Sequence, residues 1–344
     1  MARPERGSPS RVRTLARPLQ VIGRRQSGRV ADPEDALDRR RELVHGNLRW
    51  IDIQNATQAD TDDLGAEFDF HPLVLDDVLS RVQRPKLDNY ERYLFIVMHF
   101  PRFNTRERIA ITKEIDFFLG PDYIITVHNG ELPPLGNFWT SVAENLDLRA
   151  EYMGGSAELL LYHILDRLTN YLFPMMTRID KNLDQLDERI FHGSASRAVR
   201  DVGDYRRDLI SLRRIIRPDM LVVSQLENGR AVLLSEDMQP YWSDIADHFT
   251  SVWDMLAEFK EEVESLDDTF NTLYSYRTNE TLRALTLISV ILLPLTLISG
   301  IYGMNVPLPF DGQNGSLVTF IAIVTLMIVI ASAMLLFFRR KGWW

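Results

Sequence analysis

The chain has 344 residues, enough for two or three domains, and carries a formal net charge of −9. It contains no cysteine, which excludes disulfides, thiolate zinc sites and cysteine nucleophiles and fits a reducing compartment. The charge is uneven, because residues 1–30 hold eight arginines and a single acid, Glu5. We interpret residues 1–35 as a disordered basic tail and expect no secretory signal there. A solvated tail is favoured over one that contacts anionic lipid or nucleic acid, and both interpretations stay open.

Residues 36–155 have the mixed signals of a cytosolic α+β domain, in which a mixed sheet carries helices. A helical pattern covers residues 64–81. Alternating or β-rich runs, two of them separated by the turn signal Gly120-Pro121-Asp122, predict strands over residues 49–53, 93–100, 115–119 and 123–127.

Residues 156–283 are predicted to form a stalk or funnel of long helices. Apolar residues recur in steps of three and four between Leu172 and Ile190, and a second helix is expected over about residues 199–227. The longest seam has coiled-coil spacing and consists of Ile245, Phe249, Val252, Leu256, Phe259, Val263, Leu266, Phe270 and Leu273. Because no Pro or Gly interrupts residues 243–293, we predict one helix from about residue 240 to residue 302, on the order of 90 Å long.

Two apolar segments follow, residues 284–302 and 317–338, and Asp311 is the only charged residue between their outer ends. Each is near the length that crosses roughly 30 Å of hydrocarbon as a helix. We therefore predict two transmembrane helices joined by an external loop, residues 303–316, with residues 339–344 as a basic cytosolic end. The loop has no Lys or Arg, whereas the outer flanks carry Arg277, Arg283, Arg339, Arg340 and Lys341. This asymmetry predicts a cell-membrane (inner or plasma membrane) protein with both termini in the cytoplasm.

One face of the first span is unusual for a helix in lipid, because small or polar residues recur on it every three or four positions. The face consists of Asn279, Leu282, Thr286, Ser289, Leu293, Thr296, Gly300 and Gly303. It marks either a helix contact or a water-filled lumen, and periodicity does not separate these two interpretations. Two helices cannot enclose a polar path, so a pore requires several copies. Neither span has an ionisable side chain, which suits a hydrated cation such as Mg²⁺ among neutral oxygens.

Several motifs, in order and spacing, resemble the CorA family of magnesium and cobalt channels. They are residues 71–79, 83–86, 93–97, 279–286 and 293–305, the last ending in Gly303-Met304-Asn305. The resemblance covers about residue 48 to the end. It implies a homopentamer in the bilayer with a funnel-shaped cytosolic part, the first span of each copy lining the pore. It implies a selectivity filter at Gly303, Met304 and Asn305, and pore-lining positions, with leucines as a hydrophobic gate, at Asn279, Leu282, Leu285, Thr286, Leu293, Thr296 and Gly300.

The resemblance also implies that cytosolic Mg²⁺ regulates the channel from between subunits. The matching carboxylates are Asp77 with Asp244, and a second pair, Asp76 with Asp166. Carboxylates that face each other repel until a cation bridges them, so ion binding is expected to favour the closed state. Family members commonly carry a Met-Pro-Glu segment soon after the filter; this chain lacks it, and Asp311 is the candidate external attractor in its place.

Other functions remain open at this point. Mg²⁺ is the expected ion, with Co²⁺ or Ni²⁺ also passing, and Met304 favours this over a zinc (Zn²⁺) transporter of the same architecture. A membrane-tethered coiled-coil structural protein fits the stalk but leaves the polar face of the first span unexplained. The sequence has no Gly-rich phosphate loop, His-Glu-x-x-His motif or nucleophile constellation, so we expect neither an enzyme nor a transport ATPase, and no nucleic-acid partner.

Overall fold

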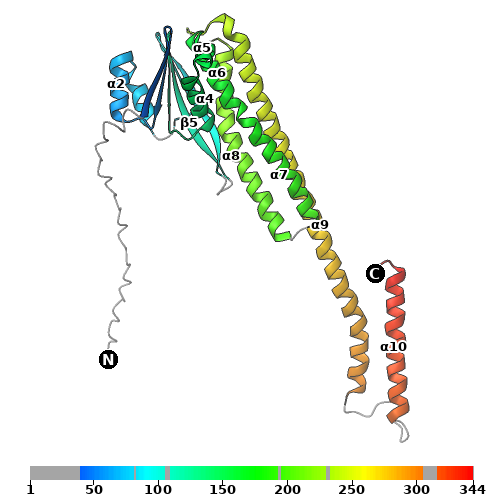
Figure 1. Ribbon diagram of the computed structural model, residues 1–344. Helices are drawn as coiled ribbons and strands as arrows, with labels where there is room; N and C mark the ends of the chain where they lie inside the picture. The colour runs from blue at the N-terminus through cyan, green and yellow to red at the C-terminus, as the bar shows by residue number, and fades with distance from the viewer. Residues whose placement is uncertain are drawn as a thin grey trace, which may run out of the picture.

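The computed structural model describes residues 39–80, 83–104, 109–192, 195–229, 233–304 and 316–343. The expected basic tail, Asn305 and Asp311 lie outside these residues. A sheet flanked by helices lies at one end of the molecule, a bundle of long helices runs away from it, and two apolar helices lie at the other end (Figure 1). This is the predicted fold class.

The sheet has six strands in the order β1-β2-β6-β5-β4-β3. Their bounds are β1 (Arg40–His45), β2 (Leu48–Gln54), β3 (Lys86–Asn89), β4 (Leu94–Asn104), β5 (Ile109–Leu119) and β6 (Tyr123–His128). Only β2 and β6 pair in parallel; the other neighbours are antiparallel. The predicted turn joins β5 to β6, where a side chain at Gly120 would collide with the ring of Tyr123, so glycine is required there.

The two faces of the sheet pack on different helices because successive strand residues point to opposite sides. On one face, Phe95, Val97 and Phe118 form a small apolar core beneath α2 (Gln58–Phe68) and α3 (Pro72–Leu79). On the other face, Trp50 and Phe117 join the main core, which continues into the stalk. The helices next to this second face are α4 (Pro133–Glu144), α5 (Leu146–Met153), α6 (Ala157–Asn170) and α8 (Ala195–Glu227), of which α8 contacts β3, β4 and β5.

The helical pattern over residues 64–81 is two helices rather than one. Asp69, at the end of α2, has left-handed backbone angles (φ 56°), and this stops the helix. His71 then caps α3, its side chain accepting a hydrogen bond from the Leu73 N–H, and Pro72 occupies the first turn. Proline at that position favours the start of a new helix, so the break has a local cause.

The stalk consists of α7 (Leu172–His192), α8 (Ala195–Glu227) and α9 (Gln239–Tyr302), with a short 3₁₀ turn, η1 (Glu236–Met238), before α9. Helix α9 has 64 residues, which is about 96 Å at 1.5 Å per residue, as predicted. Its seam is buried from Ile245 to Phe270. Beyond this point α9 leaves the bundle and runs beside α10 (Ser316–Arg340) alone (Figure 1).

Candidate ion pathway and metal-binding residues

The last part of α9 and nearly all of α10 are long and apolar enough to cross a membrane. Their apolar windows are 0% buried within the chain, whereas the core helix of a soluble protein would bury its large side chains. Leu293 is 69% exposed and Phe320 is 63% exposed. Apolar surface of this extent requires lipid or another protein copy around it, so the two helices fit a two-span membrane protein.

The structure places the pore-lining candidates along one uncovered side of α9. Every one of them is exposed within the chain: Asn279, Leu282, Leu285, Thr286, Ser289, Leu293, Thr296 and Gly300. The half-buried residues Leu287, Ile291 and Ile298 lie on the opposite side, and Leu287 and Ile291 line a groove shared with α10. The polar side of α9 therefore points away from α10 and has no neighbour within the described chain.

The hydroxyl groups on this side are arranged as acceptors. Thr286, Ser289 and Thr296 each donate their hydroxyl hydrogen to the backbone carbonyl four residues earlier, at 2.8, 2.9 and 2.9 Å. A hydroxyl that donates backwards to its own helix keeps its oxygen lone pairs for an outside partner. Neutral oxygens turned outward can accept hydrogen bonds from the water shell of a hydrated cation or from a donor group on a helix of another copy.

The described part of the filter motif lies at the end of α9 farthest from the sheet. Gly303 caps the helix, its N–H donating to the Ser299 carbonyl at 2.9 Å. A Cβ at Gly303 would lie 3.1 Å from that same carbonyl oxygen, so any larger residue is crowded there. The Met304 side chain is 56% exposed. The structure thus places Gly303 and Met304 at the end of α9, next to the uncovered side.

Two of the four regulatory candidates meet in one chain. Asp166 of α6 and Asp244 of α9 form a cluster with His248, their ligand atoms all lying within 4.8 Å of one another. The His248 Nδ1 is 4.0 Å from Asp166, and its Nε2 is 3.9 Å from Asp244. All three residues are half-buried. Two carboxylates and an imidazole at this spacing are a suitable donor set for a divalent metal ion.

The surroundings of this cluster also fit a bound cation. The His248 Nδ1 atom is buried without a hydrogen-bond partner among the described residues. The Tyr162 hydroxyl donates to Asp244 at 3.1 Å; burial and this carboxylate raise the pKa of Tyr162 to about 12. The Asn170 amide donates to Asp166 at 2.6 Å. Sequence reasoning missed His248, although its i,i+4 spacing from Asp244 on a continuous helix would have indicated it.

The other two regulatory candidates lie on α3, across the sheet from this cluster (Figure 1). Asp76 is exposed, and Asp77 accepts a hydrogen bond from Lys86 Nζ at 2.7 Å. Lys86 also pairs with Asp88 at 2.7 Å, and although burial opposes the charge, the two carboxylates keep the pKa of Lys86 raised. Within one described chain, Asp77 does not meet Asp244, and Asp76 does not meet Asp166. Those pairings require a second copy.

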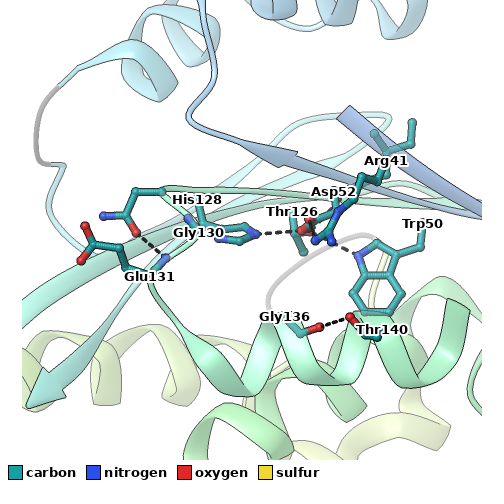
Figure 2. A network of polar contacts seen from close by, with 11 residues as sticks. Arg41, Trp50, Asp52, Thr126, His128, Gly130, Glu131, Gly136 and Thr140 are labelled. Atoms are coloured by element: carbon teal, nitrogen blue, oxygen red, sulfur yellow. Dashed lines mark hydrogen bonds and ion pairs between the residues drawn. The ribbon is translucent and has the colours of Figure 1, made fainter. Parts of the chain in front are cut away.

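A largely buried network of polar side chains in the sheet surrounds Asp52 (Figure 2). Asp52 accepts hydrogen bonds from Arg41 at 2.5 Å, the Thr126 hydroxyl at 2.7 Å and His128 Nε2 at 2.9 Å. Burial raises the pKa of Asp52, but the bonds from His128 and Arg41 outweigh it and lower the pKa. Because Asp52 and Thr126 are 0% exposed, the Asp52 carboxylate is not accessible to a substrate. With Arg41, the network links β1, β2 and β6.

Comparison with known proteins decides the family. A family model described as "CorA-like Mg2+ transporter protein" matches residues 45–340. The chain belongs to this family. The CorA-like chain is 31% identical to the "Putative metal ion transporter YfjQ" of Bacillus subtilis, covering 86% of this chain and 89% of the relative. It is 29% identical to the "Cobalt/magnesium transport protein CorA" of Thermotoga maritima, covering 86% and 83%. The resemblance seen in the sequence is confirmed.

Solved structures agree on the fold of this CorA-like chain. The complete structure of the CorA magnesium transporter from Methanocaldococcus jannaschii matches with a TM-score of 0.75 at 21% identity, over 87% of this chain and 92% of that one. The cytoplasmic domain of ZntB from Vibrio parahaemolyticus matches with a TM-score of 0.52 at 15% identity, over 67% and 88%. At these identities the two likenesses show the fold alone. The family is one of transporters, and no enzyme appears among these relatives.

Proposed function

We propose that this protein is a homopentameric channel through which hydrated Mg²⁺ crosses the cell membrane along its electrochemical gradient. The observation that carries the proposal is the uncovered side of α9, where Thr286, Ser289 and Thr296 turn hydroxyl oxygens outward on a helix with no ionisable group in its apolar part. Copies of α9 around a central axis would line a neutral, oxygen-bearing path. Both termini and the sheet domain would face the cytoplasm.

The filter would be the ring of Gly303, Met304 and Asn305 at the outer mouth. An amide and backbone carbonyls can bind the water shell of Mg²⁺ without removing it, which suits an ion that dehydrates reluctantly. Asp311, the only acid of the loop, would attract cations to the mouth. Below the filter, Leu282, Leu285 and Leu293 would form a hydrophobic constriction that gates by excluding water.

Regulation would use the Asp166, Asp244 and His248 cluster together with Asp76 and Asp77 from a neighbouring copy. The opposite location of these two acid groups on the chain supports an arrangement between subunits. A cation held there would offset carboxylate repulsion and favour the closed state, and its loss would release the stalk. Helix α9 joins this region to the pore without interruption, so a movement at Asp244 can reach the gate.

The proposed domain organisation follows the same division. Residues 1–35 form the basic tail, residues 36–155 the cytosolic domain and residues 156–283 the stalk. Residues 284–302 form the pore helix, residues 303–316 the outer loop, residues 317–338 the outer helix and residues 339–344 the cytosolic end. Mg²⁺ is the first candidate ion and Co²⁺ the second, in accord with the name of the Thermotoga relative; Ni²⁺ and Zn²⁺ are further candidates.

The test is ion uptake into proteoliposomes that contain a fluorescent indicator for divalent cations. Native protein is expected to admit Mg²⁺, and Asn305→Ala to abolish uptake while Asn314→Ala, in the same loop but outside the motif, retains it. Uptake of Zn²⁺ but not Mg²⁺ would assign the protein to zinc transport. Absence of flux for every divalent ion from a folded oligomer would reject the channel and favour the membrane-tethered coiled coil.

A further inference from the structure

A groove of about 590 Å³ lies between the stalk-side parts of α9 and α10. The interior of the groove is apolar and is lined by Leu287 and Ile291 from α9 and by Leu335 and Phe338 from α10. Its mouth is formed by Arg283 and Trp343. The groove therefore has an apolar interior within the membrane-spanning part and a polar opening at the end nearest the soluble domain.

Direct contacts join the two sides of the groove mouth. The Arg283 guanidinium donates to the backbone carbonyl of Gly342 and lies 5.4 Å from the centroid of the Trp343 ring. A cation over an indole ring gains electrostatic attraction, and indole rings favour the membrane–water interface. Arg283 and Trp343 therefore hold the segment after α10 against α9 at the level expected for lipid headgroups.

The charge around this mouth is strongly positive. Arg339, Arg340 and Lys341 follow one another at the end of α10, all exposed, and none forms an ion pair with another residue in the part of the chain that the structure describes. With Arg283 they make four cations, whereas Glu280 is the acid that lines the groove. A cationic rim above an apolar groove complements an anionic headgroup with an acyl chain attached.

We propose that this groove binds an anionic phospholipid. An acyl chain lies between Ile291 of α9 and Leu335 of α10, and the phosphate lies beside Arg283 and the cations of residues 339–341. The groove lies on the side of α9 opposite Thr286 and Ser289. An oligomer that encloses the hydroxyl side would leave the groove facing the bilayer. This orientation rests on the proposed pore, whereas binding itself requires only that the two helices span a membrane.

The binding test uses full-length protein in detergent, with lipid-bound copies counted by native mass spectrometry. Phosphatidylglycerol is expected to bind and phosphatidylcholine to bind much more weakly. Each cation near an anionic lipid contributes about fivefold in affinity, so the combined variant Arg339→Gln, Arg340→Gln and Lys341→Gln is expected to lose about 100-fold. The charge-keeping variant Arg339→Lys, Arg340→Lys is expected to bind phosphatidylglycerol as the native protein does.

A second pair of variants tests the acyl part of the site. Ala284→Phe fills the groove, since Ala284 lines it, and is expected to reduce phosphatidylglycerol binding. Ala333→Phe is the matched control because it lies on the far side of α10, each residue turning the helix by about 100°.

Equal binding of both lipids, or equal binding by the two phenylalanine variants, overturns the proposal. Loss of the oligomer in Ala284→Phe alone also overturns it, because the groove would then be a contact between copies. Mg²⁺ uptake is measured separately, so a failed pore and a failed lipid site remain distinguishable.

Discussion

Two polar clusters in this molecule differ in how completely their hydrogen bonds are satisfied. Around Asp52, three side chains donate to one buried carboxylate, and His128 Nδ1 accepts in turn from the Gly130 N–H. Around His248, two carboxylates and an imidazole lie 3.9–4.0 Å apart without a hydrogen bond between them. The Asp52 carboxylate is engaged by three donors of its own chain and links strands of the sheet, whereas His248 Nδ1 has no hydrogen-bond partner among the described residues. We propose a structural role for the first cluster and cation binding for the second.

The largest effect is expected for Asp52→Ala, which removes the carboxylate at the centre of the first cluster. Removing the carboxylate leaves the buried hydrogens of Thr126 and His128 without their acceptor, so we expect unfolding to become easier by about 3–5 kcal/mol. Urea unfolding followed by tryptophan fluorescence measures the change. Asp76→Ala, at an exposed position of α3, is the control and should leave stability unchanged. Equal stability of the two variants would mean that the Asp52 network is not a structural element.

The second test removes a ligand from the His248 cluster. Asp166→Asn is expected to leave metal-free stability nearly unchanged, because relief of repulsion offsets the lost carboxylate. Native protein should gain about 2.7 kcal/mol at a Mg²⁺ concentration 100 times its dissociation constant, and the variant should lose most of this gain. Thermal unfolding with and without Mg²⁺ measures it. Asp254→Asn, an exposed acid elsewhere on α9, should respond like the native protein; a full Mg²⁺ response in Asp166→Asn would contradict the assignment.

Asp219 is a buried carboxyl that belongs to neither cluster. Asp219 accepts from the His99 N–H at 3.0 Å, but its Oδ2 has no partner among the described residues, and burial raises its pKa well above the usual value. A raised pKa in the folded state contributes stability that is fully present below the unfolded pKa, about 3.9, and is lost as the pH rises through the folded pKa. Asp219→Asn should therefore reduce the fall in stability between pH 5 and pH 8, by up to about 1.4 kcal/mol for each pH unit below the folded pKa.

The measurement for Asp219 is urea unfolding of both proteins at the two pH values. An unchanged pH slope in Asp219→Asn would show that Asp219 ionises in the folded state as it does in the unfolded chain. The exposed Asp254→Asn variant again controls for loss of one charge.

The smallest expected effect concerns metal preference. His248→Asn replaces an imidazole, which transition metals favour, by an amide oxygen donor. Stabilisation by Co²⁺ or Ni²⁺ should weaken by about three- to tenfold in apparent affinity, and stabilisation by Mg²⁺ should change less. Thermal unfolding across a series of metal concentrations provides the ratio. An equal loss for Mg²⁺ and Co²⁺ would place His248 outside the set of ligands.

Much of the helical architecture could be predicted from the sequence because its signals are local. The seam from Ile245 to Phe270 and the lack of Pro or Gly predicted α9 as one helix, and all eight of those seam residues are buried. The stretch over residues 64–81 was harder. Its apolar pattern continues past Asp69, but the left-handed backbone at Asp69 and the proline at position 72 divide it into two helices. The spacing of apolar residues does not show where one helix ends and another begins in a new direction.

The sequence by itself determined the long helix, the two apolar spans and the family, because helix periodicity, hydropathy and motif spacing depend on residues close together in the chain. Tertiary structure decided the rest. It placed Asp166 beside Asp244 and His248, enclosed Asp52 between Arg41 and His128, and left one side of α9 uncovered. These results depend on contacts between residues distant in sequence, such as the parallel pairing of β2 with β6, and no local pattern specifies which distant side chains packing brings together.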